Sequence, residues 1–177
     1  MTVCALFPAA DPGCAAPAAI DRARLAAANI NPATGLANDY LNHFNAAIML
    51  LELLAMVPDC SEDLMAWRPM SYREHFLASR LSHRELAIAA YEAADPTARQ
   101  ALDELAEAMN DMLIAARDAV SMNPSAPVAA AVALEAAARL KLMVARAGAV
   151  INGMGENIGD QALPGVSQAA IDALMEC

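Results

Sequence analysis

The sequence predicts an all-α fold, and three observations lead to that prediction. Alanine makes up about a quarter of the 177 residues, with 45 alanines and 11 methionines, and both residue types favour helices. Aromatic residues, which favour strands, are only 4% of the chain. Apolar residues recur at spacings of three and four, as they do in amphipathic helices. We therefore expect an antiparallel up-and-down bundle of four to five main helices with short accessory helices.

The chain is expected to consist of a tail and one bundle domain. Residues 1–32 begin with a stretch rich in Pro, Ala and Gly and end at Asn31-Pro32, a pair that favours a turn. We expect this segment to be a flexible tail, with a possible short helix from Pro17 to Asn29. Residues 33–177 have a length typical of a single domain.

The first main helix is expected to begin near Thr34 or Asn38 and to end before Pro58. Beyond residue 46 it is apolar on more than one side, which is typical of a helix that is buried on two sides. Such a helix lies either at the centre of its bundle or in an interface between subunits. Its main apolar positions recur at three- and four-residue spacing and are Leu36, Tyr40, Phe44, Ala47, Ile48, Leu51 and Ala55.

Local signals place the remaining helices. Capping-box patterns at Asp59–Glu62, Ser71–Glu74 and Ser82–Glu85 predict short helices, with a kink at 80–82. Asp95-Pro96 is typical of a helix start, and the long helix that follows has heptad-spaced apolar residues. A second long helix is expected over 128–152 and a last short one over 167–176. The residues expected to face inward on the helix over 128–152 are Ala131, Val132, Leu140, Val144, Ala147 and Ile151.

The charge and the cysteine spacing exclude several classes of protein. The net charge is −10, so the chain lacks the basic face that nucleic acids or anionic membranes require. The longest apolar run, 46–57, is interrupted by Glu52 and is too short to span a bilayer. The cysteines stand far apart, which argues against disulfides or a zinc site and favours the cytoplasm. They are Cys4, Cys14, Cys60 and Cys177.

The first main helix carries the candidate functional residues. Asparagine is a poor helix former, so its recurrence on the polar side of one helix suggests a binding surface. We expect this surface to comprise Asn38, Asp39, Asn42, His43 and Asn45. The second apolar side of the helix predicts a subunit interface through Met49, Leu53 and Met56. These residues favour a non-enzymatic interaction or regulatory protein that needs no cofactor and binds a second copy of itself or another protein.

Two alternatives centre on His43. Helical bundles can hold metal ions on inward-facing carboxylates and histidines, and here the ligands would be Asp39, His43, Glu52 and His75. That alternative is a metal- or small-ligand-binding bundle, possibly enzymatic. The lesser alternative is a protein resembling histidine phosphotransfer domains, in which His43 would carry the phosphoryl group. The sequence lacks the lysine that usually follows the histidine of those domains.

Four short sequence segments resemble those of a family of small uncharacterised helical proteins of alphaproteobacteria. They are TGLANDYLNHFN (34–45), AIMLLE (47–52), YREHF (72–76) and RELAIAAY (84–91). The resemblance covers about half the chain, from 34 to 122. It implies a bacterial source and a cytoplasmic helical protein, and it implies no activity.

Overall fold

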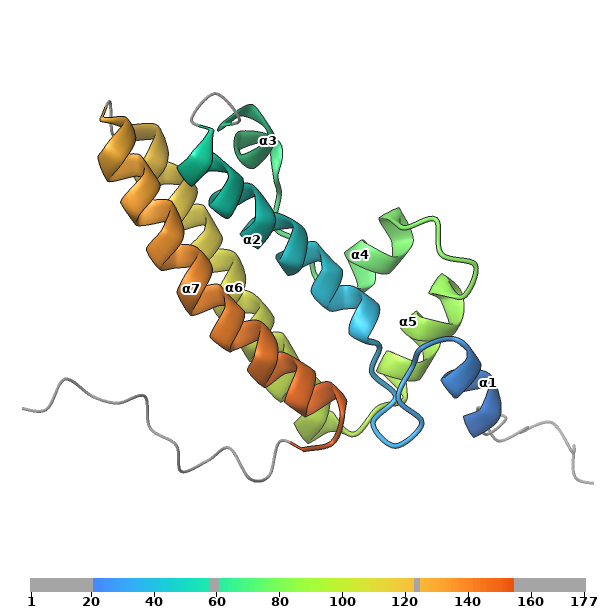
Figure 1. Ribbon diagram of the computed structural model, residues 1–177. Helices are drawn as coiled ribbons and strands as arrows, with labels where there is room; N and C mark the ends of the chain where they lie inside the picture. The colour runs from blue at the N-terminus through green and yellow to red at the C-terminus, as the bar shows by residue number, and fades with distance from the viewer. Residues whose placement is uncertain (1–20, 58–60, 123–124, 155–177) are drawn as a thin grey trace, which may run out of the picture.

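The computed structural model describes residues 21–57, 61–122 and 125–154, and this part of the chain is an all-α bundle (Figure 1). The predicted fold class is therefore confirmed. Three long helices form the body: α2 (Leu41–Met56), α6 (Pro96–Met122) and α7 (Ala126–Ile151). The shorter elements are α1 (Arg22–Ala27), the 3-10 turn η1 (Asn38–Tyr40), α3 (Ser61–Ala66), α4 (Tyr72–Ala78) and α5 (Arg84–Glu92).

Helix α7 lies along both α2 and α6 (Figure 1). Leu41, at the start of α2, lies beside Gly148 near the end of α7. Later in α2, Glu52 forms an ion pair with Lys141, which is earlier in α7. Contacts that run in opposite directions along the two helices show that α2 and α7 are antiparallel. Because α6 and α7 follow one another with only 123–125 between them, they form an antiparallel hairpin.

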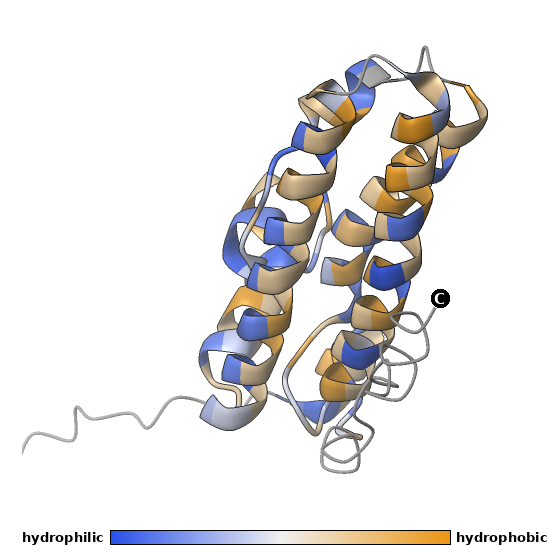
Figure 2. Ribbon diagram, turned by 90° about the vertical axis from the view of Figure 1, so that its left-hand side faces the viewer, coloured by the Kyte–Doolittle hydropathy of each residue, from blue (hydrophilic) through white to orange (hydrophobic). Residues whose placement is uncertain are grey.

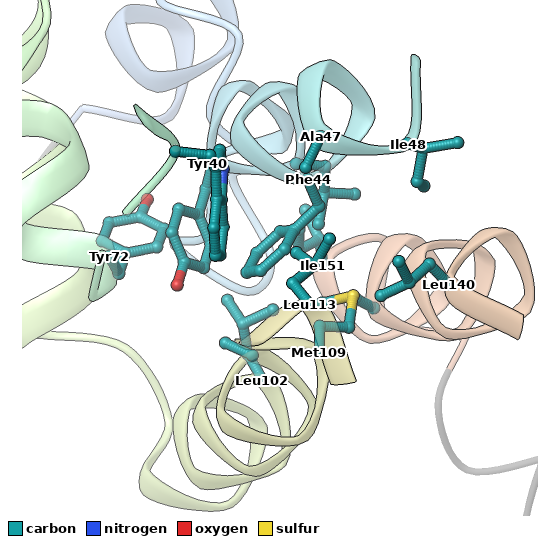
Figure 3. Packing of buried hydrophobic residues seen from close by; sticks show 14 of the residues in the cluster. Tyr40, Phe44, Ala47, Ile48, Tyr72, Leu102, Met109, Leu113, Leu140 and Ile151 are labelled. Atoms are coloured by element: carbon teal, nitrogen blue, oxygen red, sulfur yellow. The ribbon is translucent and has the colours of Figure 1, made fainter. Parts of the chain in front are cut away.

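The core lies between the three long helices and extends under α4. Phe44 points from α2 toward Met109 and Leu113 of α6 (Figure 3). The rings of Tyr40 and Tyr72 lie side by side, with centroids 5.2 Å apart, and join the core to α4 (Figure 3). The apolar stripe predicted for the first main helix is buried, apart from the half-buried Ala55. It follows that the three- and four-residue spacing identified the inward face of α2.

Helix α2 begins later than the sequence suggested. Its first residue is Leu41, and Asn38 lies in the preceding 3-10 turn. The segment before this turn is held by specific contacts: the Thr34 hydroxyl donates to the Ile151 carbonyl at 2.6 Å, and the buried Ala37 N–H donates to the Tyr72 hydroxyl at 3.0 Å. These bonds tie the entry of α2 to the end of α7 and to α4.

The capping predictions had mixed outcomes. Ser71 and Glu74 form the expected reciprocal capping box, and Asp95 accepts the Thr97 and Ala98 N–H groups at the start of α6. The box predicted at Ser82–Glu85 is wrong, because α5 starts at Arg84 with His83 at its N-cap and without a side-chain cap bond. The predictions at 58–60 and for a helix over 167–176 lie outside the described residues, as do the four cysteines.

Part of the predicted N-terminal tail packs onto the bundle. Helix α1 lies within the range predicted for a short helix, and Asp21 caps it by accepting the Ala23 N–H. Leu25 and Ile30 are buried, and Ile30 forms an isolated β-bridge with Ala37. The sequence placed these residues in a flexible tail, but their apolar side chains join the same core as α2. Residues 1–20 lie outside the described part.

Candidate functional site

His43 lies against α3 and α4 and not on the open side of α2. Its ring stacks on the ring of Trp67, with centroids 4.9 Å apart, and lies 6.0 Å from the ring of His75. Phe44 and Tyr40 complete an aromatic cluster with these two histidines. The side chain of His43 therefore joins α2 to the segment that connects α3 with α4.

The surroundings of His43 favour the neutral form of its imidazole. Burial, together with the neighbouring His75, lowers the pKa of His43 from 6.5 to about 4. Its Nε2 is buried without a hydrogen-bond partner, and the backbone of Arg68 acts against burial by raising the pKa. The indole N–H of Trp67 is likewise buried and unpaired. These two buried polar atoms have no hydrogen-bond partners, so their burial in the stacked pair of rings lowers the free energy of unfolding. Protonation of His43 in acid would weaken this contact further.

The carboxylate of Asp39 lies beside the ring of His83, which was not among the predicted metal ligands. Its carboxylate accepts from Asn29 Nδ2 at 3.1 Å and lies 3.2 Å from His83 Nε2. Burial lowers the pKa of the nearby His75, and this effect is larger than the opposite effect of Asp39. Asp39 therefore connects η1 to Asn29, which follows α1, and to His83 at the N-cap of α5.

The four predicted metal ligands do not converge. His43 and His75 are neighbours, but Asp39 is engaged by His83, and Glu52 forms its ion pair with Lys141 of α7. Among the residues that the structure describes, no group of three or more His, Cys, Asp or Glu side chains is arranged to hold a metal ion. The phosphotransfer alternative needs a histidine nitrogen that a partner protein can reach, and Nε2 of His43 is buried.

The predicted polar surface divides into two parts. Asp39 and His43 turn toward the short helices, whereas Asn42 and Asn45 are exposed on the side of α2 that also bears Met49 and Met56. Asn38 is half-buried in η1. This division arises because residues 42, 45, 49 and 56 follow helical spacing along one side, and residue 43 lies on the opposite flank.

Helices α2 and α7 together present an exposed apolar face, which we call the outer face. On α2 it comprises Met49 and Met56, which are 62% and 76% exposed, with the half-buried Leu53 between them. On α7 it includes Leu134 and Leu142, which are 51% and 59% exposed. The other exposed α7 residues of the face are Ala131, Ala138 and Ala145. Figure 2 shows hydrophobic residues all along the long helices.

Sequence reasoning found half of the outer face and missed the other half. The apolar run after residue 46 pointed to Met49, Leu53 and Met56, and the structure places all three on this side of α2. It did not indicate Leu134 or Leu142, because alanine on every side of α7 removes the contrast that marks an inward face. One feature of the sequence could have indicated them: Leu134 and Leu142 stand eight residues apart on a helix whose inward side is already supplied by alanines.

No protein-family model, curated protein or solved structure matches the chain. None of the described helices has the length and apolar character needed to cross a bilayer.

Proposed function

We propose that this protein is a non-enzymatic interaction module of regulatory type, which forms a homodimer through the outer face of α2 and α7. The observation that carries the proposal is the exposure of Met49 and Met56 on α2 and of Leu134 and Leu142 on α7, two helices that pack against each other. Helices that are apolar on all sides are normally buried on all sides. Contiguous exposed apolar residues on a folded domain mark a surface that another molecule covers.

Energetic considerations support self-association of moderate strength. Full burial of a Met or Leu side chain is worth roughly 1.5 to 3 kcal/mol, and the outer face offers four such side chains per copy. The entropy lost on association costs several kcal/mol and offsets much of this free energy. We therefore expect a dimer that dissociates on dilution. The wide spacing of the four cysteines supports placing this function in the cytoplasm.

The proposal is tested by the mass of the protein in solution. Light scattering after size-exclusion chromatography should give a mass for the unmodified protein that approaches twice the chain mass of 18.5 kDa as the loading concentration is raised. The double variant Met49→Glu with Met56→Glu should give the chain mass, because charges on the outer face cannot be buried without a partner. The matched control is Leu77→Glu on α4, a leucine that is 55% exposed away from the outer face, and it should remain dimeric. An unmodified protein that remains monomeric at every loading concentration would disprove the proposal.

A further inference from the structure

A groove lies between α6 and α7. Its volume is about 470 Å³, and small and apolar side chains make up most of its lining. The residues that line it are Met112, Ala115, Ala116, Ala119, Ala131, Val132, Glu135, Ala136 and Arg139. Glu135 and Arg139 pair with each other at 2.7 Å, and both side chains are 64% exposed. The groove therefore presents an apolar surface whose two charges neutralise each other.

Helix α6 carries a second apolar stripe that leads along this groove. Its members recur at spacings of four and three, and they are Ala101, Leu105, Ala108, Met112, Ala115, Ala119 and Met122. The inward stripe beside it, which includes Leu102, Met109 and Leu113, is fully buried, whereas the second stripe is half-buried or exposed. A helix that is apolar on two sides normally packs on both of them. The second stripe of α6 therefore offers a surface to one more helix beside α7.

The chain leaves the described part at one end of this surface. Gly153 has φ +71° and ends α7 with the hydrogen bonds of a Schellman motif. It also lines a pocket together with Val150 of α7 and Ala101 of α6. Because Ala101 is the first member of the second stripe, the segment 155–177 begins where the surface between α6 and α7 begins.

The sequence of this segment predicts a helix that suits the groove. Within it a helix is expected over 167–176, and Ile171, Leu174 and Met175 stand at spacings of three and four. Such a helix has these three side chains on one side and its two acidic residues on another. An amphipathic helix that lays its apolar side in a groove is a recurring mode of recognition.

The lengths of the segment and of the groove agree. Residues 155–166 span up to about 40 Å when extended, whereas the rise of α7 from Arg139 to Gly153 is about 21 Å. The connection is therefore long enough to reach the groove. A helix over 167–176 is about 15 Å long, and the groove extends for about 12 Å along α7 from Ala131 to Arg139.

We propose that residues 167–176 form a helix that docks in the groove between α6 and α7 of the same chain, with Ile171 and Leu174 turned into the groove. Residue 167 lies nearer Arg139 and residue 176 nearer Ala131, because the segment enters from the end of α7. The docked helix adds a fourth helix to α2, α6 and α7. It leaves the outer face open, with Ala131 at the border of the two surfaces, so the inference goes beyond the proposed function.

Paramagnetic relaxation in the full chain tests where the segment lies. The other three cysteines are replaced by serine, and a nitroxide label is attached to Cys177, which directly follows the predicted helix. The methyl signals of Met112 and Val132, which line the groove, should lose intensity. The signals of Leu77, which is exposed on α4 away from the groove, should keep theirs.

Two variants of the labelled chain show whether the apolar side of the helix is what docks. Ile171→Asp with Leu174→Asp should restore the groove signals, because these charges cannot be buried in the groove without a partner. The matched control is Ala169→Asp with Ala173→Asp, which adds the same charge on the opposite side of the predicted helix. The control should lose as much groove signal as the labelled parent.

A mixture of labelled chains with isotope-enriched chains that carry no label identifies the occupant. If each groove holds the segment of its own chain, the enriched chains keep their groove signals in the mixture. Signal loss that passes to the enriched chains would mean that the segment of a second copy fills the groove, which would overturn the proposal. Groove signals that weaken no more than those of Leu77, or that weaken equally in the two variants, would also overturn it.

Discussion

Lowering the pH from about 7 to about 5 is expected to destabilise the bundle through His43. The folded state binds a proton on this ring only near its lowered pKa of about 4, whereas the unfolded chain binds one near the ordinary value of 6.5. Between these two values the unfolded state holds more protons, so the free energy of unfolding falls as the pH falls. The stability that the neutral ring contributes is present above 6.5 and is lost progressively down to about 4.

The size of this effect follows from the shift in pKa. Each pKa unit corresponds to about 1.4 kcal/mol, so the full shift is worth about 3 kcal/mol when the pH has fallen below both values. His43 is only partly buried, and solvent screening reduces this contribution. We expect a loss of about 1 to 2 kcal/mol between pH 7 and pH 5 from this residue. His75, whose pKa is also lowered by burial, contributes with the same sign.

The assay is urea unfolding followed by circular dichroism at the two pH values. The variant His43→Phe keeps an aromatic ring against Trp67 but cannot be protonated, so its loss of stability between the two values should be smaller by about 1 to 2 kcal/mol. The remaining loss of stability between the two pH values should become smaller again when His75→Phe is added. If His43→Phe loses as much stability as the unmodified protein, the burial of an unpaired neutral imidazole is not the cause.

Three further substitutions test how the bundle is held together, each by chemical unfolding. Gly35→Ala should destabilise by more than about 1 kcal/mol, because Gly35 has φ +73° and a Cβ there would lie 2.9 Å from the Ala90 carbonyl oxygen; an unchanged midpoint would contradict this. Gly148→Ala should instead stabilise by about 0.5 to 1 kcal/mol, since its Cβ would meet only the Leu41 Cδ1 at 3.7 Å, and a loss of stability would mean that this contact is tighter. Tyr72→Phe leaves the buried Ala37 N–H without its acceptor and should cost about 1 to 3 kcal/mol, whereas a cost near zero would mean that the N–H finds another partner.

The sequence predicted the inward side of a helix correctly where the apolar and polar sides of that helix differ strongly in hydropathy. In α6 the heptad pattern from Ala98 to Val120 matches the side that is buried or half-buried. In α7 the contrast is weak: Ala131 was expected to face inward but is exposed, while Ala133, Ala136 and Ala137 are buried. Alanine fits both the core and the surface, so hydropathy alone cannot orient such a helix. The exact inward side was set by packing against α2 and α6.

The candidate site shows a similar division. The spacing of Met49, Leu53 and Met56 predicted a second apolar side of α2, on which Met49 and Met56 are exposed and Leu53 is half-buried. The metal-binding alternative placed His75 near His43, and the two rings are neighbours, although the other two predicted ligands lie elsewhere. The stacking of His43 on Trp67 could not be predicted, because Trp67 comes from a segment more than twenty residues away. Asp39 and His43 stand four residues apart, a spacing that would place them on one face of a continuous helix. The chain enters α2 through a 3-10 turn, and Asp39 pairs with His83 instead.

Sedimentation equilibrium of the unmodified full chain, measured over a wide range of concentrations, tests the central claim most directly. Self-association through the outer face predicts a mass that rises from 18.5 kDa at low concentration to twice that value at high concentration. The variant Leu134→Glu with Leu142→Glu should keep the chain mass throughout, with an unchanged circular dichroism spectrum. A constant mass of 18.5 kDa for the unmodified chain would contradict the account, as would full dimerisation of the variant.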